Sequence, residues 1–582
     1  MRTSLLPTAL LAMCFVVAPA FCFAQQPPTS PTSPSTAPAS GDPNDQFAAI
    51  AGTVVSANSG EPLKKAHVLL SRVGDDPQED DQEGGGSKNR TLGTTSDAAG
   101  HFSIEKIPAG SYDLVVDRAD YLPSHYGQDQ LDKSGATLSL APGQKMTDLL
   151  FRLNRMGIIT GRVRDEDGDP IRGAAVVSML HRTVAGKPKI ELSRSDSTND
   201  LGEYRIVDLV PGRYSIVATP PTSPFMEPAY QTEEYLPTYY SGTTDSARAS
   251  TLEVKSGDEI SGIDFAFSPK PPIRTYKVRG HVLNSLGEQD AAIAVLLFSR
   301  GNHNLDVAPD LKKAMVDGKT GDFEIKDVAP GEYTAIAASF AGAQSRMTSQ
   351  NVDVVAADID SVSLVLTRGI DITVRVALEG KSPGSVGDMS VALEPERNGE
   401  SIPFRMGRTA TAQADGSFLV KEVSDGSYSV NVYSKCRECY LKSAKANGID
   451  LLDQGVQVTG GGGPGPISMV YSSNTGTLTG AVTNKDDLPA PGAMVVLVPD
   501  AGSHQKPEQY KTANTDQYGH FEVRGVPPGH YKAFAWEKVD EESYGDPDFV
   551  KPFESNAESF DIGANEQKSV QLKMIPASDS AN

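Results

Sequence analysis

Residues 100–116 read GHFSIEKIPAGSYDLVV, and this stretch decides the fold. After the first glycine, Phe102 and Ile104 alternate with polar residues, which is the period of a strand with one buried face. A Pro-Ala-Gly turn follows, where glycine supplies a positive φ. Tyr112 then begins a second alternating segment. Two such segments joined by a short turn predict a β-hairpin.

The same phrase occurs five times along the chain. In each copy a Gly, one further residue and an aromatic residue are followed, ten positions after the aromatic, by a tyrosine. The aromatic and tyrosine pairs are Phe102 and Tyr112, Tyr204 and Tyr214, Phe323 and Tyr333, Phe418 and Tyr428, and Phe521 and Tyr531. An Asp usually precedes the first Gly, at Asp97, Asp200, Asp415 and Asp516. Self-similarity at this period indicates a repeated domain.

Further short strand patterns surround each copy. A Gly-x-Val strand opens four of the units, at Gly52, Gly161, Gly280 and Gly480, and Val374 stands at this position in the fourth unit. Many short strands without helical periodicity predict an all-β protein of five tandem antiparallel β-sandwiches. We expect these at residues 47–154, 155–270, 271–368, 369–472 and 473–577. Five sandwiches in series would form an elongated particle.

The first 46 residues have a different character. Residues 1–24 carry Arg2, an apolar stretch over 5–20 and a small-x-small motif before Gln25, which indicates a secretory signal peptide. Residues 25–46 consist largely of Pro, Ser and Thr, so we expect a disordered linker. The protein is therefore expected to be exported, into the periplasm, to the cell surface or into the medium.

The charge of the chain excludes some partners. The 53 Lys and Arg against 75 Asp and Glu give a net charge of −22. This charge repels phosphate backbones and anionic membrane surfaces, so we expect no nucleic-acid partner. No stretch after residue 24 is apolar enough for a transmembrane helix.

The repeated phrases resemble those of a known family. The Gly-x-Val strand, the Asp-x-x-Gly-x-Phe turn and the Pro-Gly-x-Tyr turn are similar to those of the carboxypeptidase regulatory-like domain, a transthyretin-like (prealbumin-like) β-sandwich. The resemblance covers nearly all of residues 47–577. It implies a stalk, an adhesion module or an accessory of an enzyme or transporter in an exported bacterial protein. The fold group also overlaps with carbohydrate-binding sandwiches. No segment remains to hold a peptidase domain.

No motif indicates catalysis or a bound cofactor. The nine His are scattered, without the spacings that metal sites use, and His101 and His520 fall on strand positions that point away from the core. Residues 165–169 form an acidic turn that begins like a calcium loop, but Val176 stands where the loop needs Glu. We therefore expect no enzyme activity, cofactor or metal site, and a scaffold or adhesion protein whose partner is a glycan or a cell-surface protein.

Cys436 and Cys439 are the cysteines that remain once residues 1–24 are removed. Their spacing fits half of a zinc site, a redox pair or a structural disulfide. Zinc needs four ligands, and redox pairs usually lie at a helix N-terminus, whereas a strand precedes this pair. In an exported protein we expect a disulfide, with a turn at Arg437 and Glu438 that brings the two Cα atoms together.

The fifth unit offers a candidate binding site. Strand alternation puts Phe534 and Trp536 on the face opposite the core residue Tyr531. Two aromatic rings on an exposed face could stack on sugars, with Glu537 and Asp540 bonding hydroxyl groups. A carbohydrate-binding protein, or an accessory to polysaccharide handling, is therefore the alternative function. The competing interpretation is that the following segment covers both rings with its own aromatic residues, Tyr544, Phe549 and Phe553.

Overall fold

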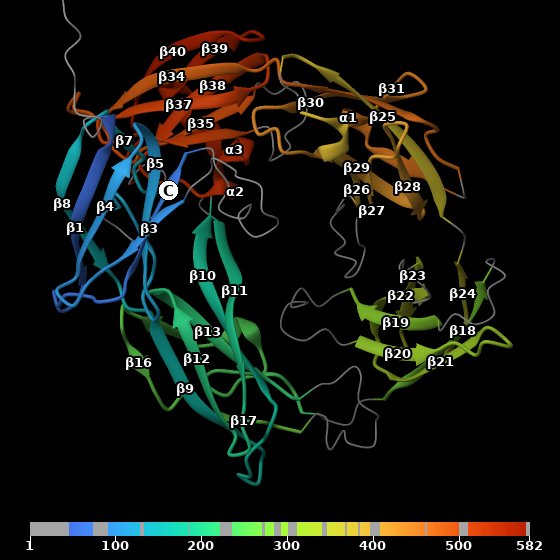
Figure 1. The fold of residues 1–582 in the computed structure, drawn as a ribbon. Coiled ribbons are helices and arrows are strands. Elements are labelled where there is room, and N and C mark those ends of the chain that lie inside the picture. The colour runs from blue at the N-terminus through green and yellow to red at the C-terminus, as the bar shows by residue number, and fades with distance from the viewer. Residues whose placement is uncertain are drawn as a thin grey trace, which may run out of the picture.

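The computed structural model describes residues 46–73, 91–128, 133–184, 187–221, 235–269, 274–284, 293–300, 311–339, 346–366, 369–381, 384–395, 408–459, 462–499 and 510–577. The expected signal peptide and nearly all of the expected linker lie outside these residues. The described residues form five domains, each a pair of β-sheets, as the sequence predicted (Figure 1).

The first domain sets the pattern. Its smaller sheet has the strand order β4-β1-β8, and its larger sheet has the order β3-β2-β5-β6, with β7 also pairing with β5. The strands are β1 (Ala48–Ser56), β2 (His67–Arg72), β3 (Leu92–Thr95), β4 (His101–Ile107), β5 (Gly110–Asp117), β6 (Ser124–His125), β7 (Leu138–Leu140) and β8 (Lys145–Leu153).

The second and third domains repeat this arrangement. In the second, β12-β9-β16 faces β11-β10-β13-β14, with β17 beside β9 and β15 beside β13. Its elements are β9 (Gly157–Arg164), β10 (Ala175–Val184), β11 (Lys187–Ser197), β12 (Glu203–Leu209), β13 (Gly212–Thr219), β14 (Thr238–Tyr239), η4 (Ser246–Arg248), β15 (Thr251–Val254), β16 (Glu259–Ile260) and β17 (Phe265–Ala266). In the third, β21-β18-β24 faces β20-β19-β22-β23. Its strands are β18 (Tyr276–Asn284), β19 (Ile293–Ser299), β20 (Leu311–Met315), β21 (Asp322–Val328), β22 (Gly331–Ser339), β23 (Arg346–Val354) and β24 (Ile359–Leu366).

The fourth and fifth domains also contain short α-helices. In the fourth, β28-β25-β33-β30-β31 faces β27-β26-β29-β32. Its elements are β25 (Ile370–Glu379), η5 (Val386–Asp388), β26 (Ser390–Pro395), β27 (Arg408–Thr411), β28 (Ser417–Val423), β29 (Gly426–Tyr433), β30 (Tyr440–Ala446), β31 (Ile449–Asp450), α1 (Leu451–Gln454), β32 (Val456–Val458) and β33 (Ile467–Ser472). In the fifth, β37-β34-β40 faces β36-β35-β38-β39. Its elements are β34 (Gly476–Thr483), β35 (Met494–Pro499), β36 (Lys511–Asn514), β37 (His520–Val526), β38 (Gly529–Trp536), α2 (Glu541–Tyr544), α3 (Pro547–Val550), η7 (Lys551–Asn556), β39 (Glu558–Ile562) and β40 (Gln567–Lys573).

The repeated phrase is a corner between two sheets and not a β-hairpin. In every domain its first strand belongs to one sheet and its second strand to the other, as β4 and β5 do in the first domain. The hairpin prediction is therefore wrong, because alternation reports which face of a strand is buried and not which strand lies beside it. Phe102 and Tyr112 both point into the core from opposite sheets, where each is nearly fully buried.

Two features shape each corner. A bulge at the end of the first strand contains a residue with positive φ, which is Lys106, Asp208, Asp327, Glu422 or Gly525 in the five domains. The tyrosine that opens the second strand donates its hydroxyl hydrogen to the carbonyl oxygen four residues earlier, in Pro108, Val210, Ala329, Ser424 or Pro527. Every phrase tyrosine therefore holds the corner at which its own strand begins.

The turn before each phrase is held by a side chain. Asp97 and Asp516 each accept hydrogen bonds from backbone N–H groups two and four residues later. In the second domain Asn199 has this role, and the Asp200 predicted from the pattern does not. A buried hydroxyl residue comes directly before the turn in three domains and bonds two backbone groups: Ser96, Thr198 and Thr515.

The opening glycines allow a close approach of the last strand. The first and last strands of each domain run parallel, as β1 and β8 do, so the predicted antiparallel pairing fails for this one pair. A Cβ atom on Gly52 would overlap the carbonyl group of Leu149 on β8, and Gly161, Gly280 and Gly480 are equally crowded. In the fourth domain Val374 stands at this position and pairs with Ile467 of β33.

Each domain has its own core of buried apolar side chains between its two sheets. The second and fifth domains each have a further cluster on the outer face of the larger sheet. Within the described parts of the chain, we find no helix with the length and apolar character that crossing a membrane requires.

The five domains follow one another around a ring, and the fifth returns to the first (Figure 1). Thr137 beside β7 forms a parallel β-bridge with Asp516, and Lys187 at the start of β11 forms an ion pair with Asp546. The expected elongated particle is therefore contradicted. The third domain lies across the ring from the first (Figure 1).

Candidate functional site

The predicted glycan-binding residues are buried. Alternation does place Phe534 and Trp536 on the face of β38 that points away from the sandwich core, but both side chains are 0% exposed. Their rings stack on each other with centroids 4.8 Å apart. An exposed aromatic platform at these two residues is therefore contradicted by the structure.

The segment after β38 covers the rings. The helices α2, α3 and η7 fold back over the larger sheet, and Phe549 and Phe553 contact Trp536 with ring centroids 6.5 and 6.2 Å away. Together with Tyr544, Val550 and Ile575 they form the satellite core of the fifth domain. The structure thus agrees with the competing interpretation, in which the segment after β38 covers both rings. The indole Nε1 of Trp536 has no hydrogen-bond partner among the described residues.

The acidic residues after β38 contact other domains. Glu537 forms an ion pair of 2.8 Å with Lys133 of the first domain, and Asp540 lies 3.7 Å from Arg182 of the second. Lys133 donates to Glu537 and holds the pKa of that carboxyl below its usual range. Lys187 acts in the same way on Asp546. Because charged carboxylates make these pairs, lowering the pH removes them.

The first and fifth domains meet through polar groups that we call the closing contact. On the first domain these are Lys133, Thr137 and Ser139, and on the fifth they are Asp516, Gln517 and Glu537. Gln517 accepts a hydrogen bond of 2.9 Å from the N–H of Ser139 and donates one of 2.7 Å to its carbonyl oxygen. The N–H of Thr137 donates to the carbonyl oxygen of Thr515 over 3.2 Å.

A tyrosine lies at the edge of the closing contact. Burial raises the pKa of Tyr126, and Tyr518 and Asp516 of the fifth domain add to that increase. The phenol of the first domain is thus close to the turn of the fifth domain that carries Gln517. The side of the closing contact formed by the first domain is the end of its larger sheet, where β7 and the Tyr126 segment lie.

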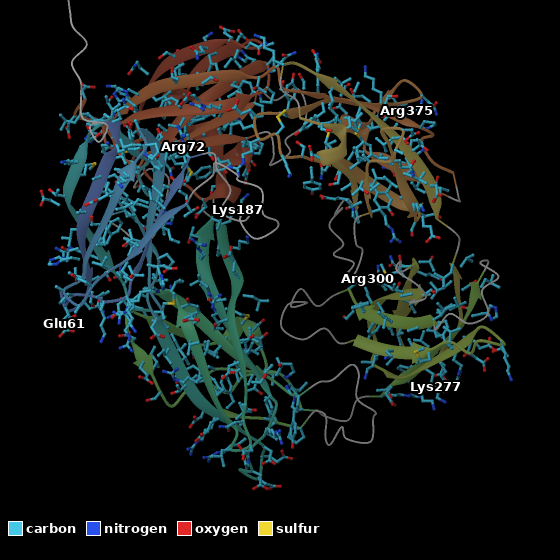
Figure 2. All side chains as sticks on the ribbon, viewed as in Figure 1. Glu61, Arg72, Lys187, Lys277, Arg300 and Arg375 are labelled. Atoms are coloured by element: carbon cyan, nitrogen blue, oxygen red, sulfur yellow. A yellow bond between two sulfur atoms is a disulfide. The ribbon has the colours of Figure 1, made fainter. Side chains whose placement is uncertain are left out.

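The second and fourth domains also contact the fifth. Figure 2 shows Lys187 at the end of the long β10 and β11 pair, beside the fifth domain. Its Nζ lies 2.9 Å from Asp546. On the other side, a Cβ on Gly525 would lie only 3.0 Å from the Cα of Glu438, so the two domains touch there. The fifth domain is therefore joined to three others.

The expected disulfide is present. Cys436 and Cys439 are bonded, with Cα atoms 5.4 Å apart. The intervening Arg437 and Glu438 make the turn that this distance requires, and β29 ends before it at Tyr433. Because Glu438 is also the residue that touches Gly525, the disulfide fixes a turn at the boundary between the fourth and fifth domains.

The two histidines of the repeated phrase lie outside the core, and the acidic turn is closed by its own backbone groups. His101 and His520 are exposed on the outer face of their sheets. In the acidic turn, Asp165 accepts hydrogen bonds from the N–H groups of Asp167 and Asp169. Among the residues that the structure describes, no three His, Cys, Asp or Glu side chains are grouped as metal ligands.

Sequence reasoning did not find the closing contact. Its partners are separated by more than 370 positions, and no periodicity relates them. The structure shows residues 537–557 as a helical segment, the helical insertion, between β38 and β39 of the fifth domain.

The fold and the contacts define a multidomain protein of repeated β-sandwiches. The model of the carboxypeptidase regulatory-like domain matches residues 49–153 and 158–235, which are the first domain and most of the second. These two domains are thus similar to that family, and the chain as a whole is a tandem array of β-sandwiches. No curated protein matches the chain.

Several solved structures are similar to parts of the chain. The minor pilin GBS52 of Streptococcus agalactiae is 13% identical over 39% of this chain and 98% of its own, with a TM-score of 0.21. The shaft pilin SpaA of Lactobacillus rhamnosus GG is 10% identical over 39% and 99%, with a TM-score of 0.19. The Bacillus anthracis TIE protein is 10% identical over 92% and 76%, with a TM-score of 0.15.

Proposed function

We propose that this chain is an exported, non-enzymatic scaffold that holds five β-sandwiches in a closed ring and presents their outer faces to a partner at the cell surface. The observation that carries the proposal is the docking of the fifth domain on the first through the closing contact. A contact with a bridge between two backbones and a reciprocal side-chain pair fixes orientation as well as proximity.

The use of the repeated residues supports a structural role. The phrase tyrosines bond the backbone at the sheet corners, the opening glycines admit the last strand, and the Asp and Asn side chains cap turns. Each of these repeated groups is thus accounted for by folding. Variation between the domains lies in their loops and outer faces, which is where binding residues are usually placed on such folds.

The proposal of export rests first on residues 1–24. Their charged start, apolar middle and small residues before Gln25 are the features that secretion machinery reads. The disulfide in the fourth domain fits the same compartment, because disulfides persist outside the reducing cytosol.

Carbohydrate binding is the alternative function, and its partner would be a glycan of the cell surface. Phe534 and Trp536 give it no support, since both rings lie under the helical insertion. An adhesive role through protein contacts is compatible with the same architecture.

The proposal is tested with labelled mature chain added to isolated cell envelopes. A scaffold of the cell surface binds saturably, and prior treatment of the envelopes with protease or with glycosidases tells whether the partner is a protein or a glycan. A second arm follows export, with Leu10→Arg and Leu11→Arg introduced together to interrupt the apolar stretch. Absence of saturable binding, or export that survives this double change, would overturn the proposal.

A further inference from the structure

The closing contact and the neighbouring contact between the second and fifth domains have the same polarity. Three ion pairs join the fifth domain to the first two, and in each the cation belongs to the first or second domain and the carboxylate to the fifth. The pairs are Lys133 with Glu537, Arg182 with Asp540 and Lys187 with Asp546. The first two domains thus offer a basic receiving surface, and the fifth domain offers an acidic one.

This polarity excludes symmetric pairing of like surfaces. Two receiving surfaces brought face to face would oppose Lys133 to cations, and two fifth domains would oppose Glu537 to carboxylates, and like charges in contact are unfavourable. The contact is therefore heterologous, with different surfaces on its two sides. A heterologous contact either closes on itself or continues from copy to copy.

We propose that the closing contact also forms between chains, so that the fifth domain of one copy docks on the first two domains of the next and copies join head to tail. The occupant of the receiving surface is then residues 514–517 and the helical insertion of a second copy. Every hydrogen bond and ion pair of the ring is kept in the exchanged form, and only the chain that supplies each partner changes.

Concentration decides between the two forms. Within one chain the fifth domain is held near the first at an effective concentration in the range of about 1 mM. The closed ring dominates in dilute solution, and exchange becomes extensive when the protein concentration approaches this value. This inference does not depend on the proposed function, because it concerns only the association of copies and not the partner that they bind.

Mixed-isotope cross-linking tests the proposal with the unaltered protein. Chains made with ¹⁴N and with ¹⁵N are mixed, incubated at about 1 mM or at about 1 µM, and treated with a carbodiimide, which joins paired Lys and carboxylate side chains directly. Lys133 and Glu537, at 2.8 Å, are suitably placed, and so are Lys187 and Asp546 at 2.9 Å. The internal control is Lys442 with Glu379, a pair of 2.7 Å within the fourth domain.

Exchange predicts that cross-links between ¹⁴N and ¹⁵N peptides appear for both interdomain pairs at the higher concentration. When half of the contacts are between chains, half of these contacts join a ¹⁴N chain to a ¹⁵N chain. Mixed cross-links should then make up about one quarter of all cross-links at each interdomain pair. The Lys442 pair should stay unmixed at both concentrations. If both interdomain pairs remain as unmixed as the Lys442 pair at about 1 mM, the proposal is wrong.

A second measurement uses charge reversal. Lys133→Glu and Glu537→Lys each place like charges in the closing contact of their own chain, whereas a mixture of the two variants restores attraction only between chains. We expect the mixture to elute as dimers or larger species in size-exclusion chromatography where each variant alone elutes as a monomer. Equal elution of the mixture and the separate variants would contradict head-to-tail joining.

Discussion

At the scale of single residues, each sheet corner depends on one backbone position with positive φ. Four of the five domains place a residue other than glycine there, with φ of 58° at Lys106, 59° at Asp208, 57° at Asp327 and 52° at Glu422. This conformation costs an L-residue roughly 1–2 kcal/mol relative to glycine. The corners of the first four domains therefore store strain that the fifth domain avoids with Gly525, whose φ is 68°.

Lys106→Gly is expected to stabilise the first domain. Removing the strain raises the free energy of unfolding. The greater freedom of glycine in the unfolded chain lowers it by roughly 0.5–1 kcal/mol, so the net increase is up to about 1 kcal/mol. Hydrogen exchange measured by mass spectrometry reports on β4 and β5 separately from the other domains and should slow by up to about fivefold. Gly525→Ala should speed exchange in the fifth domain, and faster exchange in Lys106→Gly would refute this account of the corner.

The corner tyrosines predict loss of stability in alkali. Burial raises the pKa of Tyr531 to about 12, and Tyr440 adds to the shift. The unfolded chain releases the phenol proton near pH 10, so between about pH 10 and 12 only the unfolded state is deprotonated and stability falls as the pH rises. Below pH 10 Tyr531 is protonated in both states, and its full contribution to the stability of the folded protein is present. Hydrogen exchange in β38 should therefore become faster between about pH 10 and 12, and this increase should be smaller in Tyr531→Phe. An equal increase in the variant and the native protein would contradict this role of Tyr531.

At the scale of elements, the helical insertion of the fifth domain packs within its own domain and also contacts the second domain. Its inner side covers Phe534 and Trp536, and its outer side carries Asp540 and Asp546 to the second domain. The same segment therefore couples the packing of one domain to the closure of the ring. The disulfide turn contributes on the other flank, where Glu438 meets Gly525.

Trp536 reports on this insertion because it is the only tryptophan. Its burial predicts blue-shifted emission and little quenching by iodide in the native protein. Phe549→Ala removes a ring that packs against it, which should cost about 3–5 kcal/mol locally, shift the emission to the red and increase quenching. Tyr518→Phe, on an exposed side chain of the same domain, is the control and should change neither. Red-shifted, readily quenched emission from the native protein would disprove the packing described.

At the scale of the whole molecule, sequence reasoning succeeded within domains and failed between them. Apolar alternation and five matched phrases predicted the five sandwiches, because each domain buries its own core. The same patterns wrongly predicted a hairpin at Phe102 and Tyr112, because alternation does not identify the neighbouring strand. They could not tell whether Phe534 is covered by a later segment. The ring depends on pairs such as Ser139 with Gln517, which are 378 positions apart and follow no period.

Closure of the ring by the fifth domain is the central claim. Small-angle X-ray scattering compares the mature chain with the double variant Lys133→Glu and Lys187→Glu, which reverses two of the three cations of the receiving surface. Lys442→Glu serves as a matched change away from the contact. The measurement is made at low protein concentration, so that single copies are observed.

The account predicts that the native chain and Lys442→Glu share one scattering profile, with a radius of gyration above the value of about 24 Å for a compact globule of this length. The double variant should show a larger radius of gyration and a longer maximum dimension, because its first and fifth domains separate. A native profile already matching an open array, unchanged in the double variant, would contradict the closed ring.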